Sequence, residues 1–131
     1  AGAQFFQTQA IFDTSRLEVF MDLIRNLDIK VLAGIIPLKG PKMAEFMNRR
    51  VPGIRIPEEF IKRLDAAGKG LKEDAKRTAM REEGLLIASE TIQRVCGIKG
   101  ITGVHLMGIG WEESIPELVK RAGLYPRPKV V

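Results

Sequence analysis

The sequence predicts an α/β fold in which parallel strands alternate with helices. Three short apolar runs have the composition of buried strands, at residues 4–13, 30–37 and 103–110. Segments whose apolar residues follow helical spacing come after each run. The order strand, helix, strand, helices, strand, helix predicts right-handed crossovers and therefore parallel strands. Residues 1–131 together have the length of one domain.

The first strand carries two glutamines in an otherwise apolar run. Gln7 and Gln9 are two residues apart, so a regular strand projects them to the same face. Buried amides need hydrogen-bonding partners, and each carboxamide offers both an acceptor and a donor. The edge of a carboxamide, with an acceptor beside a donor, matches the amide edge of a heterocycle such as a pterin or flavin ring. The alternative is that the glutamines satisfy only neighbouring backbone groups or buried water.

A helix is expected from Thr14 to Leu27. Asp13 is a favourable N-cap residue in front of it, and Ser15 with Glu18 forms an overlapping capping-box pattern. Apolar residues at helical spacing are expected to form its buried stripe: Leu17, Phe20, Ile24 and Leu27.

The second strand, Lys30–Pro37, is followed by two short helices. Pro41 can start the first of them, because a first helical residue needs no amide hydrogen, and the segment Val51–Gly53 ends it. Pro57 gives the same start signal for the second, which ends at residues 68–70.

A long helix is expected over Leu71–Val95. Gly84 in its middle is costly unless packing needs it, and it would permit close approach to a sheet. The third strand, Gly103–Gly110, is followed by a capping-box pattern of Ser114 with Glu117 and by a final helix that should run to Ala122. The tail Tyr125–Lys129 contains prolines and is expected to be extended on the surface.

Three parallel strands are too few to form a covered sheet. Apolar strands of this kind need neighbours at both edges and helices on both faces. The chain also begins at a strand and without methionine. We therefore expect a fragment, a processed subunit or half of an assembly, which by itself would be poorly stable and would aggregate through its open strand edges.

Composition limits the cellular compartments and the classes of binding partner that fit this chain. Hydrophobic residues make up 45%, but no apolar stretch is long enough to span a membrane and no secretory signal pattern is present, so a cytoplasmic protein is expected. Cys96 is the only cysteine, which excludes an internal disulfide and a thiol-based metal centre. The formal charge of +5 favours polyanionic partners, but basic residues are interspersed with acids and aromatics are few. No nucleic-acid partner is expected.

Ligands of parallel α/β folds bind at the carboxyl ends of the strands. This rule selects residues 9–13, 36–41 and 107–113. Gln9 lies late in its strand and is the first candidate for a ligand contact, whereas the deeper Gln7 is expected to support it.

Five other residues near these ends have both a chemical and a structural interpretation. Asp13 could be an acid, but N-capping is favoured. Glu112 and Glu113 could be an acid pair, or could stabilise the start of the last helix through its dipole. His105 is expected to be a hydrogen-bonded core residue, because no second histidine or cysteine lies at ligand spacing. Trp111 could stack on a flat ligand or anchor the last helix.

Several segments resemble the methylenetetrahydrofolate reductase family. They occur in the family's order and span nearly the whole chain: residues 1–3 with Thr8–Asp13, Ala33–Pro37, Arg55–Pro57, Gly103–Met107 and Gly110–Glu113. The resemblance implies a TIM (βα)8 barrel with flavin. This chain would be a partial barrel of about three βα units, the last three strand–helix units of the family's C-terminal portion.

The resemblance also implies an activity for the intact protein. It would bind FAD, take electrons from NAD(P)H or another donor, and reduce 5,10-methylenetetrahydrofolate to 5-methyltetrahydrofolate. This chain would supply part of the folate pocket and no catalytic residue, since the family's catalytic acid and most flavin contacts lie in the N-terminal portion. That portion or a partner subunit would have to join it, as a homo- or hetero-oligomer, and the chain alone would be incomplete and inactive.

Two alternatives keep the fold and change the activity. One is a non-catalytic folate-binding or assembly subunit. The other is a flavin-free barrel methyltransferase that uses the same pterin.

The resemblance assigns substrate contacts residue by residue. Gln9 matches the strand-end glutamine that hydrogen-bonds the pterin ring. Met43 and Met47 occupy positions where the family has a glutamine and an aromatic ring, and the adjacent Phe46 could replace that ring.

Further contacts concern the cofactor and the substrate tail. Gln7 and Met107 are the candidate flavin contacts, and Met107 stands where some members have an aromatic contact. Lys39 and Lys42 are candidates for binding a folate polyglutamate tail.

Overall fold

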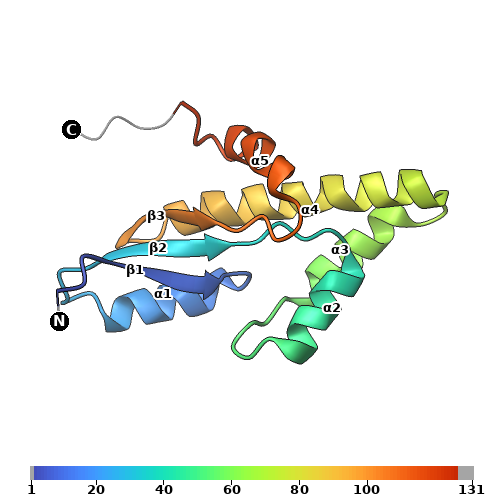
Figure 1. The fold of residues 1–131 in the computed structure, drawn as a ribbon. Coiled ribbons are helices and arrows are strands. Elements are labelled where there is room, and N and C mark those ends of the chain that lie inside the picture. Colours follow the sequence, from blue (N-terminus) through green and yellow to red (C-terminus); the bar gives the residue numbers. More distant parts are fainter. Residues whose placement is uncertain (1, 127–131) are drawn as a thin grey trace.

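The computed structural model describes residues 2–126, in which three strands form one parallel sheet (Figure 1). The strands are β1 (Phe5–Ala10), β2 (Lys30–Ile35) and β3 (Ile101–Leu106), and they lie side by side in that order. Both pairings are parallel, as predicted. Of the tail expected to be extended, residues 127–129 lie outside the described part.

The helices divide into two groups. The first group packs on one face of the sheet and consists of α1 (Thr14–Leu23), α4 (Glu73–Cys96) and α5 (Ile115–Arg121), which follows the short turn η1 (Glu112–Ser114). The second group, α2 (Pro41–Arg50) and α3 (Glu58–Gly68), lies beyond the strand ends (Figure 1).

Each group has its own core. Val31, Ala33 and Ile35 of β2 are at most 1% exposed and pack with Ile92 and Val95 of α4. The second core joins the ends of β1 and β2 to α2, α3 and α4: Ala10, Phe12, Ile36, Leu38, Ala44, Met47, Ile56, Phe60, Leu64 and Ile87. The excursion between β2 and β3 is thus anchored at the ligand-binding end of the sheet.

On the other face of the sheet, the described residues form no hydrophobic core. Alternation places Leu32 and Gly34 on the face opposite Val31 and Ala33. Gln7 pairs with Leu32 and His105 pairs with Gly34, so these side chains share that face. None of these four residues belongs to either core cluster.

A β-bulge interrupts β1 between Gln7 and Ala10. There the Thr8 hydroxyl accepts a hydrogen bond from Gly34 N at 3.0 Å and donates to Gln9 O at 2.7 Å. On the other side of β2, the Thr102 hydroxyl donates to Val31 O at 3.0 Å. Two threonine hydroxyls therefore supplement the backbone ladder at the two strand junctions.

Gly84 has the packing role that the sequence predicts. A Cβ at this position would lie 1.7 Å from Leu38 O. The helix therefore approaches the segment that follows β2, rather than the strand itself, at backbone contact distance. No side chain can be accommodated there without movement of α4.

The expected extent and stripe of the first helix were wrong in part. The helix ends at Leu23, because the chain must turn to enter β2 at Lys30. Leu17 is buried, but Phe20 is 45% exposed and Leu27 is 58% exposed. These two lie toward the β1 edge, where the described residues provide no neighbouring strand–helix unit.

The capping box expected at the last helix does not form. Ser114 instead donates from Oγ to Trp111 O at 2.7 Å, and the helix begins only at Ile115. Glu117 binds Arg121 one turn later, at 2.8 Å. The η1 turn takes the place of the expected cap.

Candidate ligand-binding site at the strand ends

Gln9 leaves β1 within the bulge, at the carboxyl end of the strand. Its side chain is exposed, and its Oε1 lies 2.7 Å from the point that a Cβ would occupy at Gly53. Gly53 is in the loop of residues 51–57 that joins α2 to α3. No hydrogen bond holds the carboxamide within residues 2–126, which leaves its donor and its acceptor free for a ligand.

The expectation that both glutamines are buried was wrong, because β1 is an edge strand in this chain. Gln7 and Gln9 are both exposed. The bulge also breaks the alternation on which their shared orientation depended. Gln7 stays in register with Leu32, on the face without a core, whereas Gln9 reaches the α2–α3 loop.

Met107 lies beside the bulge. Its N donates to Ile35 O at 2.9 Å, and its Cε lies 2.9 Å from where a Cβ would be at Gly34. The same Cβ would lie 2.7 Å from the carbonyl oxygens of both Thr8 and Gln9. Gly34 therefore lets the strand carrying Gln9 and the side chain of Met107 meet. Two residues predicted for different ligands are brought close together.

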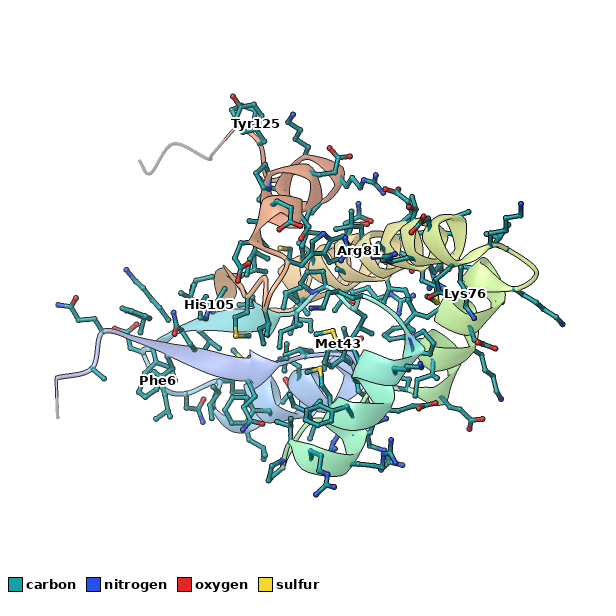
Figure 2. The ribbon with its side chains drawn as sticks, turned by 45° about the vertical axis from the view of Figure 1, so that its right-hand side comes forward. Phe6, Met43, Lys76, Arg81, His105 and Tyr125 are labelled. Carbon is teal, nitrogen blue, oxygen red and sulfur yellow. The ribbon has the colours of Figure 1, made fainter. Side chains whose placement is uncertain are left out.

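The three candidates on α2 have different environments. Met47 is 5% exposed and belongs to the second core. Met43 packs partly against that core, at the position labelled in Figure 2. Phe46 is 58% exposed. Of the three, only Phe46 presents most of its side chain to a ligand.

The Asp13 side chain caps α1, as favoured by the sequence. Its Oδ1 accepts hydrogen bonds from Ser15 N at 3.1 Å and from Ser15 Oγ at 2.5 Å. The Ser15 hydroxyl lowers the pKa of the Asp13 carboxyl below its ordinary value. The group is thus a charged cap rather than a proton donor.

Of the two acids after β3, Glu112 is engaged with the backbone. Its Oε1 accepts from Gly110 N at 3.1 Å. Trp111 is 6% exposed, and the guanidinium carbon of Arg81 lies over its ring, 5.3 Å from the ring centroid. The indole therefore anchors the turn into the last helix. Glu113 is exposed in the first turn after β3.

His105 does not fulfil the expectation of a hydrogen-bonded core residue. It is partly buried on the sheet face without a core, and its side chain makes no hydrogen bond within the described part of the chain (Figure 2). The sequence could not show this, because only the pairing of β3 with β2 decides which face the residue takes.

The two candidate lysines line a cavity of about 900 Å³ beside α2, α3 and α4. Lys39 donates to Gly110 O at 3.5 Å, which ties the ends of β2 and β3, and Lys42 is exposed. Carboxylates share this lining, so its charge is mixed: Glu45, Glu58, Asp65 and Glu73.

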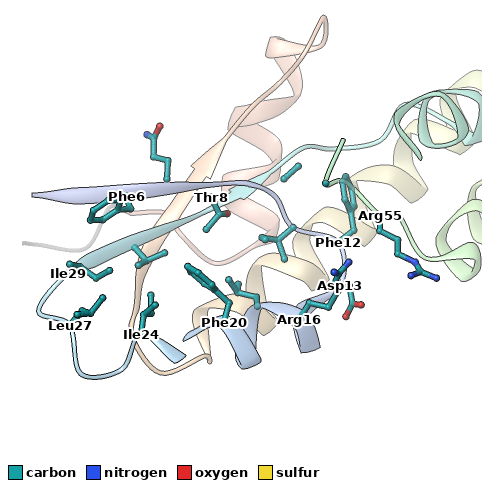
Figure 3. A pocket seen from close by; sticks show the side chains of 16 residues that line it. Phe6, Thr8, Phe12, Asp13, Arg16, Phe20, Ile24, Leu27, Ile29 and Arg55 are labelled. Atoms are coloured by element: carbon teal, nitrogen blue, oxygen red, sulfur yellow. The ribbon is translucent and has the colours of Figure 1, made fainter. Parts of the chain in front are cut away.

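Two further cavities flank α1. An apolar cavity of about 530 Å³ lies between β1 and α1, with Phe6, Phe20, Ile24 and Leu27 among its lining (Figure 3). It runs along the helix-covered side of the sheet and reaches the end of β1, where Asp13, Arg16 and Arg55 also line it. Most of its lining is apolar, which favours packing against another hydrophobic surface.

The second cavity is a polar cleft of about 840 Å³ at the strand ends. It is lined by Asp13, Arg16, Gly53 and Arg55 among others. Sequence reasoning missed Arg16, Gly53 and Arg55. The Val51-Pro52-Gly53 turn was noted only as a helix end, and nothing in the local pattern shows that it contacts Gln9.

The described part of the chain has neither a candidate metal site nor a candidate membrane span. Residues 2–126 contain no group of three or more His, Cys, Asp or Glu side chains that could hold a metal ion. None of their helices is long and apolar enough to cross a membrane.

Comparison with protein families identifies a match over most of the chain. The family model described as methylenetetrahydrofolate reductase matches residues 1–123. No curated protein matches the chain significantly.

Proposed function

The chain belongs to the methylenetetrahydrofolate reductase family, and we propose that it supplies one side of the folate pocket in a barrel that reduces 5,10-methylenetetrahydrofolate to 5-methyltetrahydrofolate. The family folds as a TIM barrel, so the three-stranded sheet is part of a barrel. The family is FAD-dependent and is associated with folate and NAD(P)H. The observation that carries the proposal is the free carboxamide of Gln9 at the carboxyl end of β1.

Gln9 is suited to recognise the pterin ring. An amide donor and an amide acceptor side by side can pair with the amide edge of a pterin in two hydrogen bonds. Gln9 lies within the bulge, and its carboxamide lies against Gly53 of the α2–α3 loop. A site that hydrogen-bonds its substrate in this way rejects analogues that lack the matching groups.

The α2 side chains complete this part of the pocket in the proposal. Phe46 supplies an exposed apolar ring against which a flat substrate can pack. Met43 is partly exposed and packs against the second core, and Met47 supports the helix from within that core.

The residues present fit FAD in part. Gln7 lies on the sheet face without a core, and Met107 lies at the end of β3 beside the bulge, so both can contact a flat ring. The chain has no phosphate-binding loop, so the pyrophosphate would be held elsewhere. When bound, FAD supplies the hydride transfer between NAD(P)H and the folate methylene group. The role of this chain is to hold and orient the folate.

The catalytic acid is assigned to the rest of the barrel. Near the site, Asp13 is a charged helix cap and Glu112 binds the backbone of Gly110. The exposed β1 edge, with Phe5 and Phe6 about half exposed at 54% and 47%, fits the addition of further strand–helix units. We call this chain with those units the assembled barrel, whether they come from the N-terminal portion or from a partner subunit.

Replacing Gln9 tests the proposal. In the assembled barrel, Gln9→Ala should raise KM for methylenetetrahydrofolate about tenfold or more, as expected for losing one or two hydrogen bonds. Reduction of the flavin by NAD(P)H without folate should be unchanged, because that half-reaction does not use the pterin edge. Unaltered folate KM in Gln9→Ala would refute the proposed role.

A non-catalytic folate-binding subunit is the second candidate. Asp13 and Glu112 are both engaged in hydrogen bonds, as expected of a subunit that contributes no catalytic acid. Visible flavin absorbance of the purified assembled barrel separates the reductase from this candidate and from a flavin-free methyltransferase. If the assembled barrel bound folate but contained no flavin, only the folate-binding subunit and the methyltransferase would remain as candidates.

A further inference from the structure

The loop of residues 51–57 is fixed at one end by a side-chain amide. Asn48 Oδ1 accepts a hydrogen bond from Ile56 N at 2.7 Å, and Asn48 Nδ2 donates to Ile56 O at 3.1 Å. Ile56 is 3% exposed and belongs to the second core. One carboxamide thus satisfies both backbone groups of a buried residue and pins the loop to α2.

The other part of the loop lies against Gln9. Gly53 has φ +83°, a conformation that favours glycine. Its missing Cβ would lie 2.7 Å from Gln9 Oε1 and 3.5 Å from Gln9 Cδ. Glycine is therefore favoured at this position by its conformation, and it leaves the space that the Gln9 carboxamide occupies.

We infer that Asn48 and Gly53 are positioning residues for Gln9, which hold its carboxamide in the orientation that reads the pterin edge. The inference rests on the proposed function. An exposed glutamine has several rotatable bonds, and binding must fix them. A backbone wall beside the carboxamide removes part of this freedom before the substrate arrives, which is preorganisation. Asn48 keeps that wall in place from the far end of the loop.

The test compares two glycines with similar backbone strain. Gly70 has φ +75°, close to that of Gly53, but no atom lies within 4 Å of where its Cβ would be. Gly53→Ala and Gly70→Ala therefore introduce the same kind of strain, and only Gly53→Ala displaces the Gln9 carboxamide. Gln9 Oε1 is the end of a flexible side chain, so it can move aside without unfolding the loop.

Binding of 5-methyltetrahydrofolate to the assembled barrel is measured by calorimetry, together with KM, kcat and thermal stability. Gly53→Ala should bind about tenfold more weakly and should raise KM with little change in kcat, as expected when hydrogen bonds to the pterin are lost. Gly70→Ala should bind as the unmodified protein does, and both variants should lose similar stability. Asn48→Asp keeps the acceptor for Ile56 N and loses the donor, and it should weaken folate binding in the same direction.

A double-mutant cycle separates this inference from the proposed function. If Gly53 acts through Gln9, Gly53→Ala should have no further effect on binding in the Gln9→Ala background. Equal effects in both backgrounds, or wild-type binding by Gly53→Ala, would overturn the inference while leaving Gln9 as a folate contact. If Gln9→Ala itself bound folate normally, the proposed function would fail as well.

Discussion

Gly84→Ala is expected to destabilise the protein, although alanine is the better helix former. The new Cβ would be 1.7 Å from Leu38 O and 2.9 Å from Leu38 C, where real contacts do not come closer than 3.0 Å. Helix α4 and the segment after β2 must therefore separate by more than about 1 Å. Both sides of this contact are buried, because Leu38 is 1% exposed and its neighbour Ile87 is 1% exposed.

The magnitude follows from two opposing effects. Forcing a methyl group against buried backbone costs about 3 kcal/mol, the upper part of the range for overpacked cores. Replacing glycine by alanine within a helix returns about 1 kcal/mol. The net expectation is a loss of about 2 kcal/mol in the free energy of unfolding, or roughly 6–10 °C in Tm for a chain of this size.

Urea unfolding followed by circular dichroism measures this loss. Gly97→Ala is the matched control, because Gly97 caps the same helix with φ −81° and its Cβ would make an ordinary contact of 3.4 Å with Arg94 O. The control should change stability by no more than about 0.5 kcal/mol. A Gly84→Ala variant as stable as the unmodified protein, or more stable, would refute the close approach.

Three further predictions concern other parts of the chain. Arg63 binds Glu83 at 2.6 Å and Glu90 at 2.8 Å and lowers the pKa of the Glu90 carboxyl, so Arg63→Met should cost about 1 kcal/mol at neutral pH. This contribution is present above the ordinary pKa of 4.5 and is lost as pH falls below it, so urea titrations of variant and parent should converge in acid. Asp13→Ala should cost about 1 kcal/mol in thermal unfolding by removing the α1 cap, with folate binding unchanged; altered binding would contradict a purely capping role. Phe20→Ser should reduce light scattering by the chain expressed alone, because Phe20 is 45% exposed beside the open edge, and undiminished scattering would exclude this surface as the cause.

The sequence was sufficient for features set by local chemistry. The parallel direction of the strands follows from the alternation of apolar runs and helices. Asp13 was predicted as a cap from its residue type before a helix, and Gly84 as a close approach from its position in one. In both cases the responsible interaction is short-range or leaves only one favourable residue type.

Features that depend on the placement of distant segments could not be predicted. Helical spacing placed Phe20 and Leu27 on a stripe predicted to be buried, but it does not reveal that residues 2–126 leave both side chains largely exposed. The environment of His105 depends on the β2–β3 register. The contact of Gln9 with Gly53 requires α2 and the following loop to fold back over the end of β1, which no local pattern encodes.

The two threonine bonds that flank β2 have a consequence for the order of folding. The Thr8–Gly34 bond closes a loop between residues 26 apart, whereas the Thr102–Val31 bond joins residues 71 apart. Loop-closure entropy alone makes the second junction costlier by about 0.9 kcal/mol. We therefore expect β1, α1 and β2 to dock first, and β3 to join only after α2, α3 and α4 have condensed. The strand that bears Gln9 would then be in place before the strand that ends at Met107.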